Sequence, residues 1–464
     1  MYDQREKTLV EHAVEKLPFV PSERQFVLLC SMAAFVVNGG PRDVFVLNGY
    51  AGTGKTSVVG SLIKAMEEMK RKVVVLAPTG RAAKVAAGLS GHKASTIHRR
   101  LYRPNLSDPT GKSYFIAPNE SVDTLFVVDE ASLISDDGTS RSLLKLLVDY
   151  VYSAPGCRLL LVGDEAQLPP VGQRDSTAMR RERLVELGLD PIRFVLDVPA
   201  RQKEDSGIVH NATLVRQKME ALDSGVPLWL EATGFPDVEV VDPRELPDKL
   251  SDSYSEVGQE ETLVITRSNW RANDFNRAIR TQVLWAEEPL QRGDRLIVSK
   301  NDYFWGKVNK SPGLIANGDM AVVTWVGKNV KAYGRWFAEV ELQLSDGRLV
   351  SVNLMLRSLV CEGPAIPRAE MERLFNVCMA QTEGELSEKI KASMEDPYYN
   401  AVQAKYGYCV TCHKAQGGEW DHVYIDMGGI NMEEVDIEFY RWLYTALTRA
   451  KKKVFLINPT VKVK

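Results

Sequence analysis

The sequence predicts an α/β protein of two parallel-sheet lobes, with a small hairpin inserted in the first and a β-rich, small-barrel-like unit inserted in the second. A strand-like apolar run at residues 43–47 is followed by a glycine-rich loop and then by apolar residues at helical spacing. A second alternation of strands and helices begins near residue 261, without a glycine-rich loop of its own. At 464 residues the chain is also too long for one typical core.

The composition is that of an ordinary globular protein, with 44% hydrophobic and 26% charged residues. No run of about 18 apolar residues occurs, so no membrane span is expected. Residues 1–7 are charged and lack the apolar core of a signal peptide. Six scattered cysteines favour free thiols in a reducing compartment, so we expect a cytoplasmic protein. Because the net charge is −3, any nucleic acid would have to be held by a local groove rather than by bulk charge.

Residues 49–56, Gly-Tyr-Ala-Gly-Thr-Gly-Lys-Thr, fit the phosphate-loop pattern of Gly, four residues, then Gly-Lys-Ser/Thr. Glycines let backbone N–H groups turn toward a phosphate at the positive end of the following helix. Lys55 supplies a charge to the β- and γ-phosphates, and Thr56 a hydroxyl ligand for Mg²⁺. We therefore expect binding of a nucleoside triphosphate; a glycine-rich turn without a ligand is the alternative. The candidate nucleotide-binding residues here are Gly49, Tyr50, Ala51, Gly52, Thr53, Gly54, Lys55, Thr56 and Ser57.

A helix is predicted just before this loop, with Ser22 as its N-cap and its end near residue 37. Gln25, one turn into the helix, has the donor and acceptor needed to bind an adenine edge. An exposed helical glutamine is the alternative.

A second buried strand is predicted at residues 73–78 and ends in a basic loop. Loops at the carboxyl ends of parallel strands are where an α/β sheet binds ligands, so Thr79, Arg81 and Lys84 are candidates for phosphate contacts. His98 follows in another basic segment; read alone, it would more often be a packed or solvated histidine.

Residues 103–121 are rich in turn formers and interrupt the alternation of strands and helices. A plain surface loop is one interpretation. The other is a small inserted hairpin with an aromatic residue near its tip.

Two further strand ends carry polar side chains. The apolar run at residues 125–128 ends in Asp129 and Glu130, of which one acid can hold the Mg²⁺ shell and the other can polarise an attacking water. The run at residues 158–162 leads to Gln167, an uncharged side chain able to sense the γ-phosphate. Paired acids at a strand end are common, but after a phosphate loop they indicate hydrolysis.

The second half begins with a linker-like stretch and then a second α/β layer. Residues 293–360 alternate short apolar runs with turns, which predicts a small antiparallel unit, and residues 366–396 are charged and helical. Residues 300–400 are therefore interpreted as an insertion. Cys409 and Cys412 form a lone Cys-x-x-Cys, and neither metal binding nor redox chemistry is expected of this pair. Arg449, at the end of the last helix, is a candidate arginine finger; alone it would be a favourable cation at a helix C-terminus.

In combination, these segments resemble the superfamily 1B DNA helicases, the group of RecD, Dda and the Pif-type enzymes. The resemblance spans nearly the whole chain. Its pieces, in order, are Gln25, residues 49–56, 77–84, 95–98, 128–132, 163–170 and 200–202, the set Thr411, His413, Lys414, Gln416 and Gly417, and residues 444–449.

The resemblance implies two RecA-like lobes with ATP between them. The front lobe would span residues 1–200 with a pin hairpin at 103–121, the rear lobe 201–300 and 401–464, and an accessory domain 301–400. Catalytic roles would fall to Lys55, Asp129, Glu130, Gln167, Arg201 and Arg449, metal ligation to Thr56 and Asp129, and further nucleotide contacts to Gln25, Gln416, Gly417 and Glu419.

Single-stranded DNA would cross both lobes, and Phe115 or Tyr114 would act as the strand-separating wedge. The implied nucleic-acid contacts are Pro78, Thr79, Arg81, Ser95, His98, Phe115, Asn269, Thr411, His413 and Lys414. The residues 78–84 and 163–167 look more like RecD than like the Pif-type enzymes, so roles at G-quadruplexes or telomeres do not carry over. Because no long N-terminal extension or nuclease-like segment is present, assembly into a RecBCD-like nuclease is not expected.

The expected activity is ATP- and Mg²⁺-dependent unwinding of DNA with 5′→3′ translocation, by a monomer acting at single-strand/duplex junctions in repair, replication or recombination. Single-strand-binding, replication and repair proteins are candidate partners. Two other interpretations stay open: a translocase or RNA helicase that remodels protein–nucleic acid complexes, and a nucleotide-gated single-strand binding protein.

Overall fold

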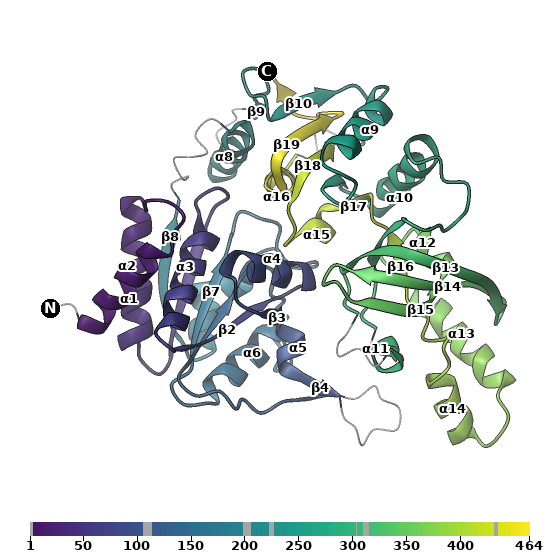
Figure 1. Ribbon diagram of the computed structural model, residues 1–464, viewed down its shortest axis with the longest axis horizontal. Helices are drawn as coiled ribbons and strands as arrows, with labels where there is room; N and C mark the ends of the chain where they lie inside the picture. The colour runs from purple at the N-terminus through teal and green to yellow at the C-terminus, as the bar shows by residue number, and fades with distance from the viewer. Residues whose placement is uncertain are drawn as a thin grey trace.

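The computed structural model describes residues 3–104, 114–197, 206–221, 227–302, 304–309, 315–430 and 435–464. Two parallel sheets flanked by helices lie next to an antiparallel sheet (Figure 1). We call the unit around the first parallel sheet the front lobe, the unit around the second the rear lobe, and the antiparallel unit the insert. Within the described ranges, no helix is both long and apolar enough to cross a bilayer.

The front lobe is built on a six-stranded parallel sheet in the order β3-β2-β6-β7-β1-β8. Its central strands are apolar on both sides because helices cover both faces. The strands are β1 (Asp43–Gly49), β2 (Lys72–Ala77), β3 (Ala94–Thr96), β6 (Thr124–Val128), β7 (Arg158–Gly163) and β8 (Asp190–Leu196). The helices are α1 (Gln4–Glu15), α2 (Glu23–Asn38), α3 (Lys55–Glu68), α4 (Gly80–Ser90), α5 (Ile97–Leu101), α6 (Leu143–Tyr152) and α7 (Arg181–Glu186), with 3₁₀ turns at Ala131–Leu133 and Thr177–Met179.

The rear lobe has a five-stranded parallel sheet in the order β10-β19-β18-β11-β17. Helices α8 and α16 pack against each other on one side of it. The strands are β10 (Val238–Val241), β11 (Thr262–Thr266), β17 (Cys409–Thr411), β18 (Trp420–Asp426) and β19 (Ala450–Ile457), with a small parallel pair β9 (Trp229–Leu230) and β20 (Lys462–Val463). The helices are α8 (Gly207–Glu220), α9 (Leu246–Glu256), α10 (Asn269–Ala278), α15 (Cys412–Ala415) and α16 (Ile437–Leu447), and a π-helical turn at Ile279–Val283 extends α10.

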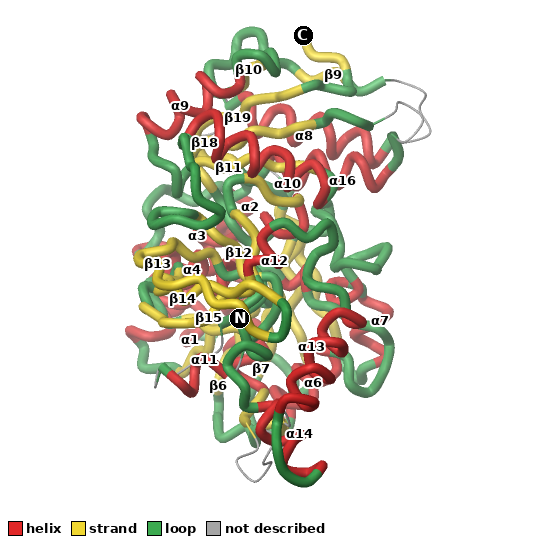
Figure 2. The backbone as a smooth tube through the Cα atoms, turned by 90° about the vertical axis from the view of Figure 1, so that its right-hand side faces the viewer, coloured by secondary structure: helices red, strands yellow, loops and turns green. Residues whose placement is uncertain are grey.

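The insert is an antiparallel sheet in the order β15-β14-β13-β12-β16, and Figure 2 shows β13, β14 and β15 stacked as one sheet. Tyr333 and Gly334 both have positive φ, which suits the tight turn between β13 and β14. The elements are β12 (Arg295–Val298), β13 (Met320–Ala332), β14 (Arg335–Leu344), β15 (Leu349–Met355), β16 (Ala404–Tyr406), α11 (Phe304–Val308), α12 (Leu356–Leu359), α13 (Arg368–Gln381) and α14 (Leu386–Met394).

The antiparallel sheet extends beyond residues 300–400 at both ends: β12 begins at Arg295, within the antiparallel unit predicted for residues 293–360, and β16 ends at Tyr406. These two strands pair with each other, so the chain enters and leaves the insert side by side. The insert also shares one apolar core with the rear lobe, in which Leu296 packs with Val264 and Tyr424. The two units are therefore one packed body at this junction.

A short antiparallel pair projects from the front lobe (Figure 1). It consists of β4 (Tyr102–Pro104) and β5 (Tyr114–Ile116), with Arg103 opposite Phe115. The residues between the two strands, 105–113, lie outside the described part of the chain.

Candidate nucleotide-binding and nucleic-acid sites

The phosphate loop joins β1 to α3 and leaves the start of that helix open. Gly52 and Gly54 adopt positive φ values of 75° and 80°, which favour glycine. A Cβ on Gly49 would lie 2.9 Å from Cδ of Lys55, so the Lys55 side chain folds back over the loop. No side chain caps α3, so its first N–H groups remain available to an anion.

Gln25 of α2 binds the phosphate loop through its side-chain amide. Its Oε1 accepts from the backbone N–H of Ser22 at 2.9 Å, and its Nε2 donates to the carbonyl of Thr53 at 2.9 Å. The side chain is 2% exposed, so it is not the exposed helical glutamine of the alternative interpretation. Because both ends of the amide already have partners, the structure gives Gln25 a role in positioning the loop, which the sequence did not indicate.

The paired carboxylates follow β6. Asp129 lines one small cavity together with Thr56, so the two expected Mg²⁺ ligands lie together. Burial raises the pKa of Asp129 to about 7; the neighbouring Glu130 adds to this rise, and Lys55 opposes it. Glu130 has a positive φ of 53°, an uncommon backbone conformation for a residue with a Cβ.

Two polar atoms in this site are buried without a hydrogen-bond partner among the described residues: Oε2 of Glu130 and Oε1 of Gln167. Buried polar groups normally find partners, so each such atom calls for an explanation. A Mg²⁺-nucleotide with its attacking water would supply both partners. The residues present therefore fit Mg²⁺ and a nucleoside triphosphate.

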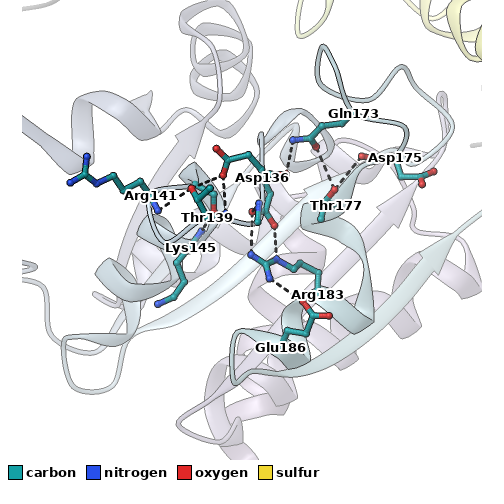
Figure 3. A network of polar contacts seen from close by, with 12 residues as sticks. Asp136, Thr139, Arg141, Lys145, Gln173, Asp175, Thr177, Arg183 and Glu186 are labelled. Carbon is teal, nitrogen blue, oxygen red and sulfur yellow. Dashed lines mark hydrogen bonds and ion pairs between the residues drawn. The ribbon is translucent and has the colours of Figure 1, made fainter.

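The segment after the paired carboxylates is fixed by a network around Asp136 (Figure 3). Arg183 donates to the Asp136 carboxylate from Nε at 2.6 Å and from a terminal nitrogen at 3.2 Å, and Gln173 donates to the Asp136 carbonyl at 2.8 Å. A few residues further on, Asp175 accepts from Arg441 of α16 at 3.2 Å. The network thus connects the loops of the nucleotide site to the rear lobe.

Tyr444 of α16 makes a direct bond from the rear lobe to the phosphate loop. Its hydroxyl accepts from the backbone N–H of Ala51 at 2.9 Å and donates to Oδ2 of Asp164 at 2.7 Å. Next to it, Thr445 accepts from the N–H of Leu168 at 2.8 Å. Both residues lie in the segment 444–449 quoted for the resemblance, but nothing in that pattern indicated these partners.

The other predicted rear-lobe contacts lie around the same junction. Gln416 donates to the Leu168 carbonyl at 2.6 Å. Gly417 has a positive φ of 71°, and a Cβ there would meet Ala82 at 2.9 Å. The negative charge of Glu419 adds to the rise in the pKa of Asp129, so this rear-lobe residue acts electrostatically on the nucleotide site of the front lobe.

Arg449 lies two residues beyond the end of α16 and is 3% exposed. Its guanidinium donates to the carbonyls of Thr445 at 3.0 Å and Gly418 at 3.1 Å, and to the hydroxyl of Thr448 at 3.1 Å. In this state the rear lobe therefore holds the arginine at its own carbonyls. The other predicted arginine, Arg201, lies outside the described residues.

Tyr50 and Ser57 complete the predicted nucleotide contacts. The half-buried Tyr50 ring lies under the guanidinium of Arg216, at 4.3 Å from the ring centroid. Ser57 lies in the first turn of α3. The structure therefore gives Tyr50 a partner in α8, on the rear-lobe side, which the phosphate-loop pattern did not indicate.

In the front lobe, the predicted nucleic-acid contacts lie at the carboxyl edge of the sheet. Thr79 follows Pro78 and caps α4 by accepting from the N–H of Ala82 at 3.2 Å. Ser95 lies in β3, and His98 lies in the first turn of α5, where its ring stacks on Tyr102 with 5.7 Å between the ring centroids. Burial lowers the pKa of His98, so the ring is neutral at pH 7.

Arg81, which the sequence predicts as a phosphate contact, instead packs against the rear lobe. Its guanidinium lies 3.8 Å from the ring centroid of Trp420 in the rear lobe, and it donates to the Glu419 carbonyl at 3.4 Å. Burial lowers its pKa to about 10, and the neighbouring Arg295 adds to the decrease. A partly buried cation–π pair of this kind is worth about 1 kcal/mol, so Arg81 contributes to joining the lobes.

In the rear lobe, the predicted contacts come from α10 and from α15 with its N-cap. Thr411 is the N-cap of α15, which carries His413 and Lys414, and Asn269 begins α10. The pKa of Lys414 is lowered to about 8 by burial, with Lys405 adding to the decrease. Phe115 stands apart from this group, on the projecting hairpin, and is 51% exposed.

The phosphate loop lies in one parallel-sheet lobe, and side chains of a second parallel-sheet lobe bind to it. This arrangement defines the class of the protein: a phosphate-loop protein with two such lobes in tandem. Two family models match the chain: the AAA domain over residues 32–204 and the UvrD-like helicase C-terminal domain over residues 406–457. Each of these matches falls within a different lobe.

Among curated relatives, the ATP-dependent RecD2 DNA helicase of Deinococcus radiodurans is 26% identical over 432 residues, covering 88% of this chain and 46% of the relative. The ATP-dependent DNA helicase dda of Enterobacteria phage T4 is 23% identical over 443 residues, covering 89% of this chain and 93% of the relative. The chain thus spans about half the length of the RecD2 protein that it matches.

Among solved structures, the Pif1 helicase from Bacteroides in complex with ADP-AlF3 and ssDNA shares the fold. Its TM-score is 0.50 at 16% identity, covering 96% of this chain and 93% of that one. These likenesses indicate a helicase of superfamily 1B. The predicted fold class of two RecA-like lobes in tandem, with an added antiparallel unit, is confirmed.

Proposed function

We propose that this chain is an ATP-dependent DNA helicase that moves 5′→3′ on single-stranded DNA and separates the duplex ahead of it. The observation that carries the proposal is the junction at Tyr444, where a rear-lobe hydroxyl binds both the phosphate loop and Asp164. A nucleotide at that loop lies where the lobes meet, so its hydrolysis changes how they fit together.

Each residue of the nucleotide site has a separate role in ATP hydrolysis. Thr56 and Asp129 would hold Mg²⁺, which neutralises phosphate charge when bound. Lys55 lies over the loop to contact the outer phosphates, and Glu130 takes a proton from the attacking water. Gln167 orients that water. Arg449 leaves its own carbonyls and turns toward the phosphates as the lobes close, which couples closure to hydrolysis.

Closing and opening of the lobes then move the strand. Front-lobe groups at Thr79 and His98 and rear-lobe groups at Asn269 and Lys414 grip the backbone alternately. The hairpin that carries Phe115 divides the strands as one of them is drawn past. Opening one base-pair step costs about 1.4 kcal/mol, which a single ATP exceeds, so one step per ATP is feasible.

The direction of movement is tested with duplexes that carry one single-stranded tail. We expect unwinding of the 5′-tailed duplex and none of the 3′-tailed duplex, measured by strand displacement with ATP and Mg²⁺. Unwinding of the 3′-tailed duplex alone would overturn the polarity. Displacement of a bound protein from either DNA without strand separation would favour a translocase.

Replacing Phe115 with alanine is expected to lower the unwinding rate at least tenfold and to change DNA-stimulated ATP hydrolysis less than twofold. The hairpin side chain acts on the duplex and not on the nucleotide. Trp285, which is 79% exposed in the rear lobe, offers a matched control as Trp285→Ala. Equal losses of unwinding and ATP hydrolysis in Phe115→Ala would remove the wedge role.

A further inference from the structure

A cavity of about 510 Å³ lies at the amino ends of β2, β6 and β7 in the front lobe. The strands of this sheet are parallel, so their amino ends lie at the opposite edge from the phosphate loop, which follows the carboxyl end of β1. The volume is within the range of about 300–1,000 Å³ that small-molecule sites have. The charged side chains that line the cavity are Lys70, Arg71, Lys72, Asp123 and Arg158.

Four of these side chains are cations and one is a carboxylate, in a chain whose net charge is −3. Among the described residues, the side chains of Lys70, Arg71 and Lys72 have no hydrogen-bond or ion-pair partner. A cation at the C-terminal end of α3 suits the negative end of the helix dipole, but that effect falls off within the last turn. It does not account for Lys72 in β2 or Arg158 in β7. The positive charge gathered here is therefore suited to an anionic ligand.

Arg158 is the half-buried cation of the cavity. One of its terminal nitrogens donates to the Gly39 carbonyl at 2.6 Å, which fixes the guanidinium against α2. Its Nε is buried and has no hydrogen-bond partner in the part of the chain that the structure describes. Buried donors normally have partners, so this one calls for an explanation. A guanidinium that keeps donors unused matches the oxygens of a phosphate.

The backbone on two sides of the cavity has an uncommon conformation. Lys70, the residue after the C-cap of α3, has a φ of 58°, and Asp123, just before β6, has a φ of 50°. Glycine is the usual residue after a helix C-cap, because a Cβ disfavours this backbone, and residues held in such conformations cluster at functional sites. The left-handed turn at Lys70 also allows three consecutive basic residues to line one cavity, whereas consecutive residues of a straight strand alternate between two faces.

The spacing of the cations indicates the length of the ligand. Lys72 pairs with Thr124 of β6, and Arg158 pairs with Leu125 of the same strand, so the lysine and the arginine come from opposite sides of β6. Neighbouring strands are about 4.8 Å apart, which places the two backbones about 10 Å from each other. A chain of two or more phosphates spans this separation better than a single phosphate does.

We propose that this cavity binds a small compound that carries a chain of at least two phosphates, as a nucleoside diphosphate or a free polyphosphate does. Arg158 offers its planar guanidinium to one phosphate, and Lys72 and its two basic neighbours neutralise the next. The cavity is separate from the phosphate loop, so it can be occupied while ATP is bound there. The site does not depend on the helicase function proposed above.

The test titrates inorganic tripolyphosphate into the protein by calorimetry, with the phosphate loop saturated with a non-hydrolysable ATP analogue. Lys72→Met keeps the apolar stem of the side chain and removes its charge, and we expect it to weaken binding about tenfold, as for the loss of one hydrogen bond to a charged group. Lys64→Met is the control, at an exposed lysine of α3 that does not line the cavity. It is expected to keep the affinity within about twofold, because salt screens a distant exposed charge.

A second variant, Asp123→Asn, is expected to change the affinity in the opposite direction. It removes the negative charge from the cavity lining, and asparagine tolerates the left-handed backbone at this position. Tripolyphosphate should therefore bind Asp123→Asn severalfold more tightly than the unaltered protein. Unchanged or weaker binding would refute the electrostatic basis of the site.

The remaining outcomes decide whether the site exists and what it takes. If tripolyphosphate does not bind the saturated protein, or binds Lys72→Met and Lys64→Met equally well, the site is refuted and the helicase function stands. If Lys72→Met weakens binding of duplex DNA and leaves the affinity for tripolyphosphate unchanged, the cations hold a nucleic-acid backbone and the small-compound assignment is overturned. GTP carries the same chain of three phosphates: tighter binding than that of tripolyphosphate identifies a nucleotide as the ligand, and weaker binding identifies a free polyphosphate.

Discussion

Glu130→Gln is expected to lower DNA-stimulated ATP hydrolysis by about 10²- to 10⁴-fold, the contribution typical of a general base. Glutamine keeps the size of the side chain and its hydrogen-bonding oxygen but cannot take the proton of the attacking water. The Oε2 of Glu130 is buried and has no hydrogen-bond partner among the described residues. This is the arrangement expected of a carboxylate that accepts a hydrogen bond from the attacking water once that water is bound. Turnover would be measured with saturating oligo-dT and Mg²⁺-ATP.

Binding of nucleotide should survive this change. A fluorescent ATP analogue is expected to bind Glu130→Gln within about threefold of the unaltered protein, because Lys55 and the loop N–H groups remain. Glu68→Gln provides a matched control at a carboxylate that pairs with Lys16 at 2.9 Å on the same lobe. Normal turnover in Glu130→Gln would show that another residue acts as the base.

Arg449→Ala is expected to reduce DNA-stimulated turnover by about 10³- to 10⁵-fold, the range seen when an arginine finger is removed. The guanidinium is held at 3.0 and 3.1 Å by carbonyls of its own lobe, so it must exchange these bonds for phosphate oxygens on closure. Alanine leaves nothing to make that exchange. The basal affinity for ATP should fall far less than the rate, because the contact forms only in the closed state.

Because Arg449 is buried, its removal also threatens the fold of the rear lobe. Arg449→Lys separates the two effects: it keeps the charge but cannot reproduce the planar set of donors. A variant that melts like the unaltered protein and still loses most of its turnover supports the finger. A variant that keeps its turnover while losing only thermal stability would make Arg449 a structural residue.

The parts of the molecule that the sequence predicts best are those set by local pattern. The phosphate loop, the buried strand before it and the acids after β6 all depend on residues close together in the chain. Parallel strands carry their carboxyl ends to the same edge of a sheet, so Thr56 and Asp129 were expected to meet, and they line one cavity.

The parts that it does not predict depend on pairing between distant segments. The C-terminal limit of the insert is set by β16, which is too short to be recognised alone and is part of the sheet because it pairs with β12. The bond from Tyr444 to Ala51 joins residues 393 positions apart, and no pattern of apolar spacing reports it. Lys405 is 5% exposed because the insert packs against α10, where Asn273 accepts from its Nζ at 3.3 Å, and no local pattern indicates that packing.

Gln25 shows a third limit. The sequence puts Gln25 on the helix that precedes the phosphate loop, but the bond to the Thr53 carbonyl depends on how the loop folds over α2. A side chain with both a donor and an acceptor fits an adenine edge and a backbone turn equally well, and only the fold distinguishes them.

The central claim is that the two lobes share one triphosphate, cradled by the front lobe and completed by Arg449 from the rear. A crystal structure with ADP–aluminium fluoride and oligo-dT tests it most directly. We expect the Arg449 guanidinium within hydrogen-bonding distance of the fluoride group, with its bonds to Thr445 and Gly418 broken. A nucleotide bound at Lys55 while Arg449 remains on those two carbonyls would contradict the claim.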